Sequence, residues 1–199
     1  MEKKNRDIEY YKRSLCEADN EVRIQHKTKK ALKDVIGAAF ENHRNRIWTY
    51  FGFEVSKEKH GALFNVDWSI TYNRRLIALE EDKGHYIDSC FMERAISGFC
   101  KTVNEYQKKG VQVPILIIHS FTRYKKFSEK LQEDMDTRKP EIIEEIQKKL
   151  VYTTLVDCDR LSKNKWFSSE LYDCYSLNAN EEFIIKDIEF ITSLIPTFE

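Results

Sequence analysis

The chain has 199 residues, of which 41% are hydrophobic and 13% aromatic. This composition predicts a folded domain with a substantial core and excludes a disordered chain. The 33 basic and 33 acidic residues give a formal net charge of zero. That balance argues against a protein that coats nucleic acid through overall charge, but it is compatible with a basic cleft around an acidic centre.

The five cysteines stand far apart and form no CxxC pair. This pattern predicts neither a disulfide framework nor a zinc site, and it favours a reducing compartment. No apolar run approaches the roughly 20 residues that span a bilayer, and residues 1–14 lack the apolar stretch of a signal peptide. We therefore expect a cytoplasmic protein with no membrane partner.

Taken in chain order, residues 4–30 are highly charged and predict one or two exposed helices. Apolar residues at 3.6-residue spacing then predict a helix from residue 30 to residue 51, which Gly52 ends. A turn is expected at residues 72–75, between a strand of alternating pattern and the strand that follows it. The three strands of this region are expected over 53–57, 63–71 and 76–82.

The second half of the chain continues the alternation of helices and strands. Helices are expected over 88–109, 124–135, 140–150 and 180–195, and strands over 113–119 and 151–156. This order predicts an α/β sandwich with a mixed sheet, in which an antiparallel meander comes first and crossover helices bring later strands alongside. We expect a single domain, with a helical appendage over 1–29, a core over 30–156 and an extension over 157–199.

The candidate catalytic residues stand in two short segments, Val66-Asp67-Trp68 and Glu81-Asp82-Lys83. Residues i and i+2 of a strand share a face, so Glu81 and Lys83 are expected together, and the hairpin can bring Asp67 beside them. Two neighbouring carboxylates repel each other unless a cation compensates them, and Mg²⁺ prefers such oxygen ligands. The metal would activate water and a phosphodiester, while Lys83 would orient or deprotonate that water.

These segments resemble the motif of the PD-(D/E)XK nuclease superfamily: Asp67, a spacer of thirteen residues, then Glu81-Asp82-Lys83. Val66 replaces the proline that often precedes the aspartate. Residues 37–41 and 50–55 are similar to the opening helix and strand of resolvase-like and restriction-like members, in which a helix glutamate often joins the metal site. Glu41 is the counterpart of that glutamate here.

The resemblance implies a restriction-endonuclease-like α/β/α sandwich with a central mixed sheet and extra terminal helices. It implies catalysis by Asp67, Glu81 and Lys83, with one or two Mg²⁺ ions. The candidate metal ligands are Asp67, Glu81, Asp82 and Glu41. An alternative register would make Glu80 the ligand, and Lys83 would then no longer share its face.

Basic residues near these segments are candidates for contacts with DNA phosphates, which bind without reading sequence. The hairpin tip, with Arg74 and Arg75, is expected to lie next to the candidate site. Of the basic groups in the chain, the candidate DNA-binding residues are Arg44, Arg74, Arg75, Lys125 and Lys126.

The expected function is Mg²⁺-dependent endonucleolytic cleavage of double-stranded DNA by a type II restriction endonuclease. A homodimer is expected, with one or both terminal helices in its interface. One alternative is a structure-specific nuclease such as a Holliday-junction resolvase. Another is a non-catalytic DNA-binding or subunit module of the same fold, although such a module would usually lack the acid or the lysine.

Overall fold

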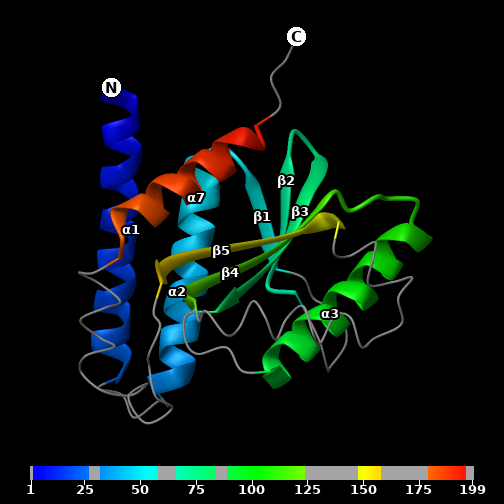
Figure 1. The fold of residues 1–199 in the computed structure, drawn as a ribbon, viewed down its shortest axis with the longest axis horizontal. Coiled ribbons are helices and arrows are strands. Elements are labelled where there is room, and N and C mark those ends of the chain that lie inside the picture. Colours follow the sequence, from blue (N-terminus) through cyan, green and yellow to red (C-terminus); the bar gives the residue numbers. More distant parts are fainter. Residues whose placement is uncertain are drawn as a thin grey trace.

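The computed structural model of the chain describes residues 2–26, 32–57, 66–83, 89–123, 148–157 and 179–195. Within these residues, a mixed five-stranded sheet lies between helices on both of its faces. Three helices, α1, α2 and α7, cover one face, and α3 covers the other (Figure 1). The expected α/β class with a mixed sheet is therefore confirmed.

The strands follow one another across the sheet in chain order, β1-β2-β3-β4-β5. The first three form an antiparallel meander, and β3, β4 and β5 run parallel. A parallel pair needs a crossover, and α3 supplies the one between β3 and β4. The strand bounds are Glu54–Lys57 (β1), Trp68–Tyr72 (β2), Arg75–Lys83 (β3), Ile115–Arg123 (β4) and Leu150–Asp157 (β5).

The turn between β2 and β3 falls where the sequence predicts it. Asn73 and Arg74 both have positive φ, 49° and 63°, as in the two-residue turns that match the twist of a hairpin. β2 begins only at Trp68, so Asp67 lies immediately before the strand and not within it. Residues 58–65, which include the first part of the expected strand, lie outside the described residues.

The N-terminal helix belongs to the core. α1 (Glu2–His26) packs along α2 (Leu32–Tyr50), and its apolar stripe is buried. Fully burying one such side chain contributes roughly 1.5–3 kcal/mol. The predicted helix is therefore confirmed, but its prediction as an exposed appendage is wrong, because residues spaced three and four apart form one buried apolar face. The buried apolar residues of α1 are Ile8, Tyr11, Leu15, Ala18 and Val22.

The C-terminal helix α7 (Glu181–Ser193) completes the same layer. Asn180 caps it by accepting a hydrogen bond from the backbone N of Glu182 at 2.9 Å, as the sequence predicts. The helix packs against β5 and α1. Its apolar residues Ile184, Ile188 and Ile191 are buried in the core of this same chain.

On the other face, α3 (Ser89–Lys108) places Phe99 and Val103 against Leu79 and Leu116 of the sheet. Gly110, with φ of 71°, follows the helix end, as expected. The helices expected over 124–135 and 140–150 fall almost entirely on residues outside the described ranges. Within those ranges, no helix has the length and apolar character to cross a membrane.

Candidate active site

The last residues of β3 alternate between the two faces of the sheet. Lys83 Nζ lies 3.6 Å from Glu81 Oε1, on the face where Leu79 packs towards α3. Glu80 and Asp82 are buried on the opposite face. The expected pairing of Glu81 with Lys83 is confirmed, because the side-chain period of a strand is two residues.

Asp67 lies directly opposite Glu81. β2 and β3 are antiparallel with Trp68 paired to Glu80, so the next opposed pair is Asp67 and Glu81. Asp67 Oδ2 also accepts a hydrogen bond of 2.7 Å from the backbone N of Asp82. The hairpin therefore brings the two candidate carboxylates together at its open end, as the sequence predicts.

The surroundings of these carboxyls disfavour their charged forms. Burial raises the pKa of Asp67 to about 7, and the negative charge of Glu41 adds to the effect. Burial raises the pKa of Glu81 to about 8, and the charge of Asp67 is the next largest cause. The positive charge of Lys83 opposes both shifts. Both groups thus exchange protons near neutral pH, where a bound cation would favour their ionised forms.

Glu41 of α2 is an electrostatic neighbour of the pair. Its carboxylate forms an ion pair of 3.2 Å with Lys57 Nζ on β1, and its charge raises the pKa of both Asp67 and Glu81. Among the described residues, no three His, Cys, Asp or Glu side chains lie close enough as they stand to hold a metal ion. The centre of the candidate site is therefore the pair Asp67 and Glu81.

Arg44 is fully buried behind β3. Its Nε and Nη2 donate to the two oxygens of Glu80 at 2.7 and 3.1 Å, and its Nη1 donates to Asp187 Oδ2 at 2.7 Å. Trp48 Nε1 also donates to Glu80, and the Tyr11 hydroxyl donates to Asp187. The prediction that Arg44 contacts DNA is wrong, because its side chain is 0% exposed and engaged by carboxylates inside the core.

The side chain of Asp82 lies on the same face of the sheet as Arg44 and Glu80, the face covered by α1, α2 and α7, which we call the rear face. Trp68 Nε1 donates to Asp82 Oδ2 at 2.7 Å, and Arg44 Nε lies 3.9 Å from Asp82 Oδ1. Burial, and then the charge of Glu80, raises the pKa of Asp82 well above its usual range. The prediction that Asp82 is a metal ligand is wrong, because strand alternation turns its carboxyl away from Asp67 and Glu81.

The other basic candidates are not at the pair. Arg74 and Arg75 are exposed at the hairpin tip, whereas Glu81 stands six residues further along β3, about 20 Å at the rise of a strand. The prediction that the tip lies next to the site is wrong, because Asp67 and Glu81 occupy the open end of the hairpin. Lys125 and Lys126 lie outside the described residues.

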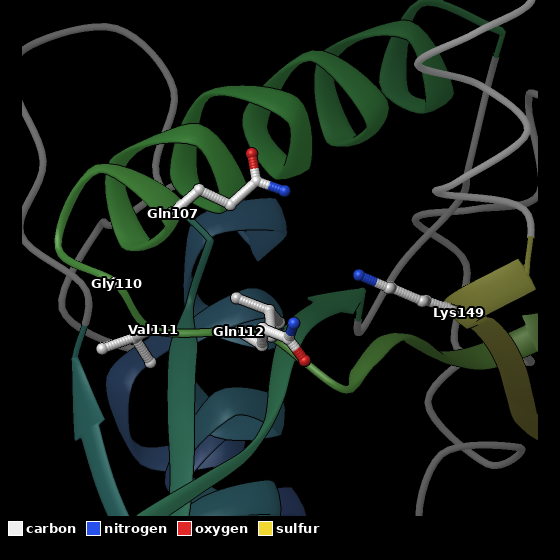
Figure 2. A pocket seen from close by; sticks show the side chains of 6 residues that line it. Gln107, Gly110, Val111, Gln112 and Lys149 are labelled. Carbon is white, nitrogen blue, oxygen red and sulfur yellow. The ribbon is translucent and has the colours of Figure 1, made fainter.

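A separate pocket of about 360 Å³ lies where α3 ends and β4 and β5 begin (Figure 2). Ile115, at the start of β4, pairs with Ala78, whereas Lys83 pairs with Ser120. The pocket is thus at the other end of these strands from the candidate site. Its lining residues are Gln107, Gly110, Val111, Gln112, Val113 and Lys149.

The buried network of Arg44, Glu80 and Asp187 is the feature that sequence reasoning missed. The sequence does contain a pattern that indicates it, because Arg44 stands four residues after Phe40 and three before Ile47 on the apolar stripe of α2. Asp187 similarly lies within the stripe of α7 and is 2% exposed. A charged residue inside an apolar stripe indicates a buried ion pair.

Comparison of the chain with models of known protein families, with curated proteins and with solved structures finds no match. The functional assignment therefore depends on the geometry and chemistry of the site.

Proposed function

We propose that the chain is a Mg²⁺-dependent nuclease of the PD-(D/E)XK class that hydrolyses phosphodiester bonds of double-stranded DNA. The observation that carries this proposal is the opposition of Asp67 and Glu81 at the open end of the β2–β3 hairpin, with Lys83 beside Glu81. Two carboxylates and a lysine are the groups that the motif requires at these positions.

The order of elements supports the same class. An opening helix, α2, precedes the antiparallel meander β1–β3, and the crossover α3 leads to the parallel strand β4. This is the order expected of the restriction-endonuclease-like fold that the motif implies. Asp67 lies immediately before β2 and Glu81 lies near the end of the adjacent strand β3, where that fold would hold its metal ligands.

The donor set fits Mg²⁺. Mg²⁺ takes oxygen ligands and is commonly held by one or two carboxylates, while waters and substrate phosphate oxygens complete its octahedron. Asp67 and Glu81 offer two such carboxylates, and their raised pKa values reflect burial and charge repulsion that a cation would relieve. When bound, the ion would polarise a phosphodiester oxygen and make a coordinated water more acidic.

The side chains of the chain itself then have distinct tasks. Asp67 and Glu81 would hold the ion, and Glu41 would add negative charge to the same site. Lys83 Nζ is a compact cation beside Glu81, so it would orient the attacking water and stabilise the charge that develops on the phosphate.

The finer assignment is a type II restriction endonuclease that acts in the cytoplasm as a homodimer. Cutting both strands of a duplex uses two active centres, and a two-fold dimer supplies them in the symmetry of a palindromic site. The apolar stripes of α1 and α7 are buried within the chain, so the proposed interface uses their outward faces. Arg74 and Arg75 would contact phosphates away from the scissile bond.

Incubation of supercoiled plasmid with the purified protein, in Mg²⁺ or in EDTA, tests the proposal. We expect cleavage in Mg²⁺ alone and its loss in Asp67→Ala and Glu81→Ala. Glu105→Ala, at an exposed acid of α3, serves as the matched control and should cleave normally. Cleavage in EDTA, or full activity of either site variant, would overturn the proposal.

Two other outcomes of the same assay separate the alternatives. Mg²⁺-dependent cleavage that is confined to branched substrates would indicate a structure-specific nuclease. Duplex binding without hydrolysis of any tested DNA would indicate a non-catalytic module.

A further inference from the structure

Two adjacent residues, Asp67 and Trp68, both form hydrogen bonds with Asp82 of β3, one with its main chain and the other with its side chain. Asp67 Oδ2 accepts a hydrogen bond from the backbone N of Asp82 at 2.7 Å. Trp68 Nε1 donates to Asp82 Oδ2, also at 2.7 Å. Asp82 is thus held through its main chain on the side of the candidate site and through its side chain on the buried side.

The hydrogen bond between Trp68 and Asp82 is buried. Trp68 is 6% exposed and Asp82 is 4% exposed, so water cannot readily replace either partner if the bond opens. Arg44 Nε lies 3.9 Å from the second oxygen of Asp82 and is itself fixed by the two oxygens of Glu80. The buried face of β3 is therefore anchored at two successive inward positions.

We infer that Trp68 and Asp82 are positioning residues that fix Asp67 beside Glu81. The inference rests on the proposed function, because it concerns the same metal site. The Trp68–Asp82 bond holds β3 against β2 at the level where the Asp82 amide binds Asp67. That amide occupies one oxygen of Asp67 and so limits how the carboxylate can turn towards the ion.

The expected consequence is a change in metal affinity. Loss of a hydrogen bond that orients a metal ligand commonly weakens metal binding or activity by about 10- to 100-fold. Trp68→Phe removes the donor but retains a large aromatic ring. We therefore expect the Mg²⁺ dissociation constant of this variant to rise within that range, and exchange of the Asp82 amide hydrogen to become faster.

Trp48→Phe is the matched control. Trp48 is also buried and also donates its Nε1 to a carboxylate of β3, Glu80, at 2.9 Å. Glu80 keeps both bonds from Arg44 when this donor is lost. A comparable loss of stability is expected, but Mg²⁺ affinity and exchange of the Asp82 amide should stay within about 3-fold of the parent.

A conservative pair of substitutions at Asp82 gives the second test. Asp82→Asn keeps a side-chain oxygen that can accept from Trp68 and should retain Mg²⁺ affinity. Asp82→Ala removes the acceptor and should weaken binding as Trp68→Phe does. Retention in the asparagine variant would also agree with the absence of Asp82 from the metal ligands.

Two measurements on the full chain decide the outcome: the Mg²⁺ dissociation constant from titration calorimetry, and amide hydrogen exchange in EDTA. The inference is supported if Trp68→Phe changes both and Trp48→Phe changes neither. Equal effects of the two variants, or faster exchange with unchanged Mg²⁺ affinity, would overturn it. A parent protein that neither binds Mg²⁺ nor cleaves would overturn the proposed function, and the inference with it.

Discussion

Replacement of both candidate ligands by their amides should stabilise the chain at alkaline pH when no divalent ion is present. The pKa of Asp67 is raised from 3.8 to about 7, and that of Glu81 from 4.5 to about 8. The folded chain thus holds protons that the unfolded chain releases. The stability contributed by the neutral carboxyls is full below about pH 4 and is lost as pH rises through about 8.

The size of the effect follows from these values. A tenfold change in proton affinity corresponds to about 1.36 kcal/mol, so ionisation of Asp67 alone costs on the order of 4 kcal/mol of unfolding free energy. The pair together loses less than twice this amount, because their mutual repulsion is one interaction that enters both shifts. Since 1 kcal/mol moves the unfolding midpoint of such a chain by about 2–4 °C, Asp67→Asn/Glu81→Gln should unfold at least about 10 °C above the parent at about pH 8.5 in EDTA.

Thermal unfolding followed by circular dichroism, from about pH 5 to 9, measures the difference between parent and variant. Burial lowers the pKa of His43 and His119 well below the usual value. Their contribution therefore has the opposite sign, and stability rises with pH as it passes through about 6.5. Both proteins contain these histidines, so their effect cancels in the difference. Parallel profiles for the two proteins would refute the reasoning, as would an equal rise of both midpoints with Mg²⁺.

Four further outcomes are expected. Lys83→Ala should lose cleavage but still bind Mg²⁺ by calorimetry, because the lysine is not a ligand; loss of binding would contradict this role. Glu80→Gln should lower the unfolding free energy by a few kcal/mol, because it weakens a buried ion pair, yet its folded form should cleave. Glu81→Gln should be stable and inactive. Cleavage by Glu81→Gln but not by Glu80→Gln would exclude Glu81 as the ligand. Arg74→Gly should raise the unfolding free energy by up to about 1 kcal/mol in denaturant titrations, because Arg74 has φ of 63°. A lower unfolding free energy in this variant would show that the turn is not strained. Light scattering at micromolar concentration should give a dimer mass with or without duplex DNA, and a monomer mass in both would favour sequential nicking.

Local periodicity predicted much of the site. The alternation that places Glu81 with Lys83 follows from strand geometry, and the turn at 72–75 follows from polar residues between an alternating run and the next strand. The prediction that Arg74 lies next to the site was wrong for a geometric reason. In an antiparallel hairpin, residues that precede the first strand and end the second meet at the open end, so the tip is as far from them as the strands are long.

The interior charges were harder to predict because composition and periodicity point in opposite directions. Arg44 stands close to Arg46 in a basic segment, which favours an exposed phosphate contact. Its spacing from Phe40 and Ile47 favours burial, and burial is what the structure has. No local pattern indicates which acidic residue will neutralise Arg44, because Glu80 and Asp187 are 36 and 143 residues away in the chain.

The acidic residues on the two faces of β3 are in different surroundings, and this difference supports the proposed position of the active site. On the rear face, Glu80 is neutralised by Arg44, and the raised pKa of the buried Asp82 favours its uncharged form. At the front, the side chains of Glu81 and Lys83 are 13% and 23% exposed, so ions and substrate can approach them. Asp67 and Glu81 repel each other and are partly exposed, so they can exchange protons for a divalent cation. The buried carboxyls of Glu80 and Asp82 can only hold the strand in place. One strand thus combines a rigid buried face with a front face suited to metal-dependent chemistry.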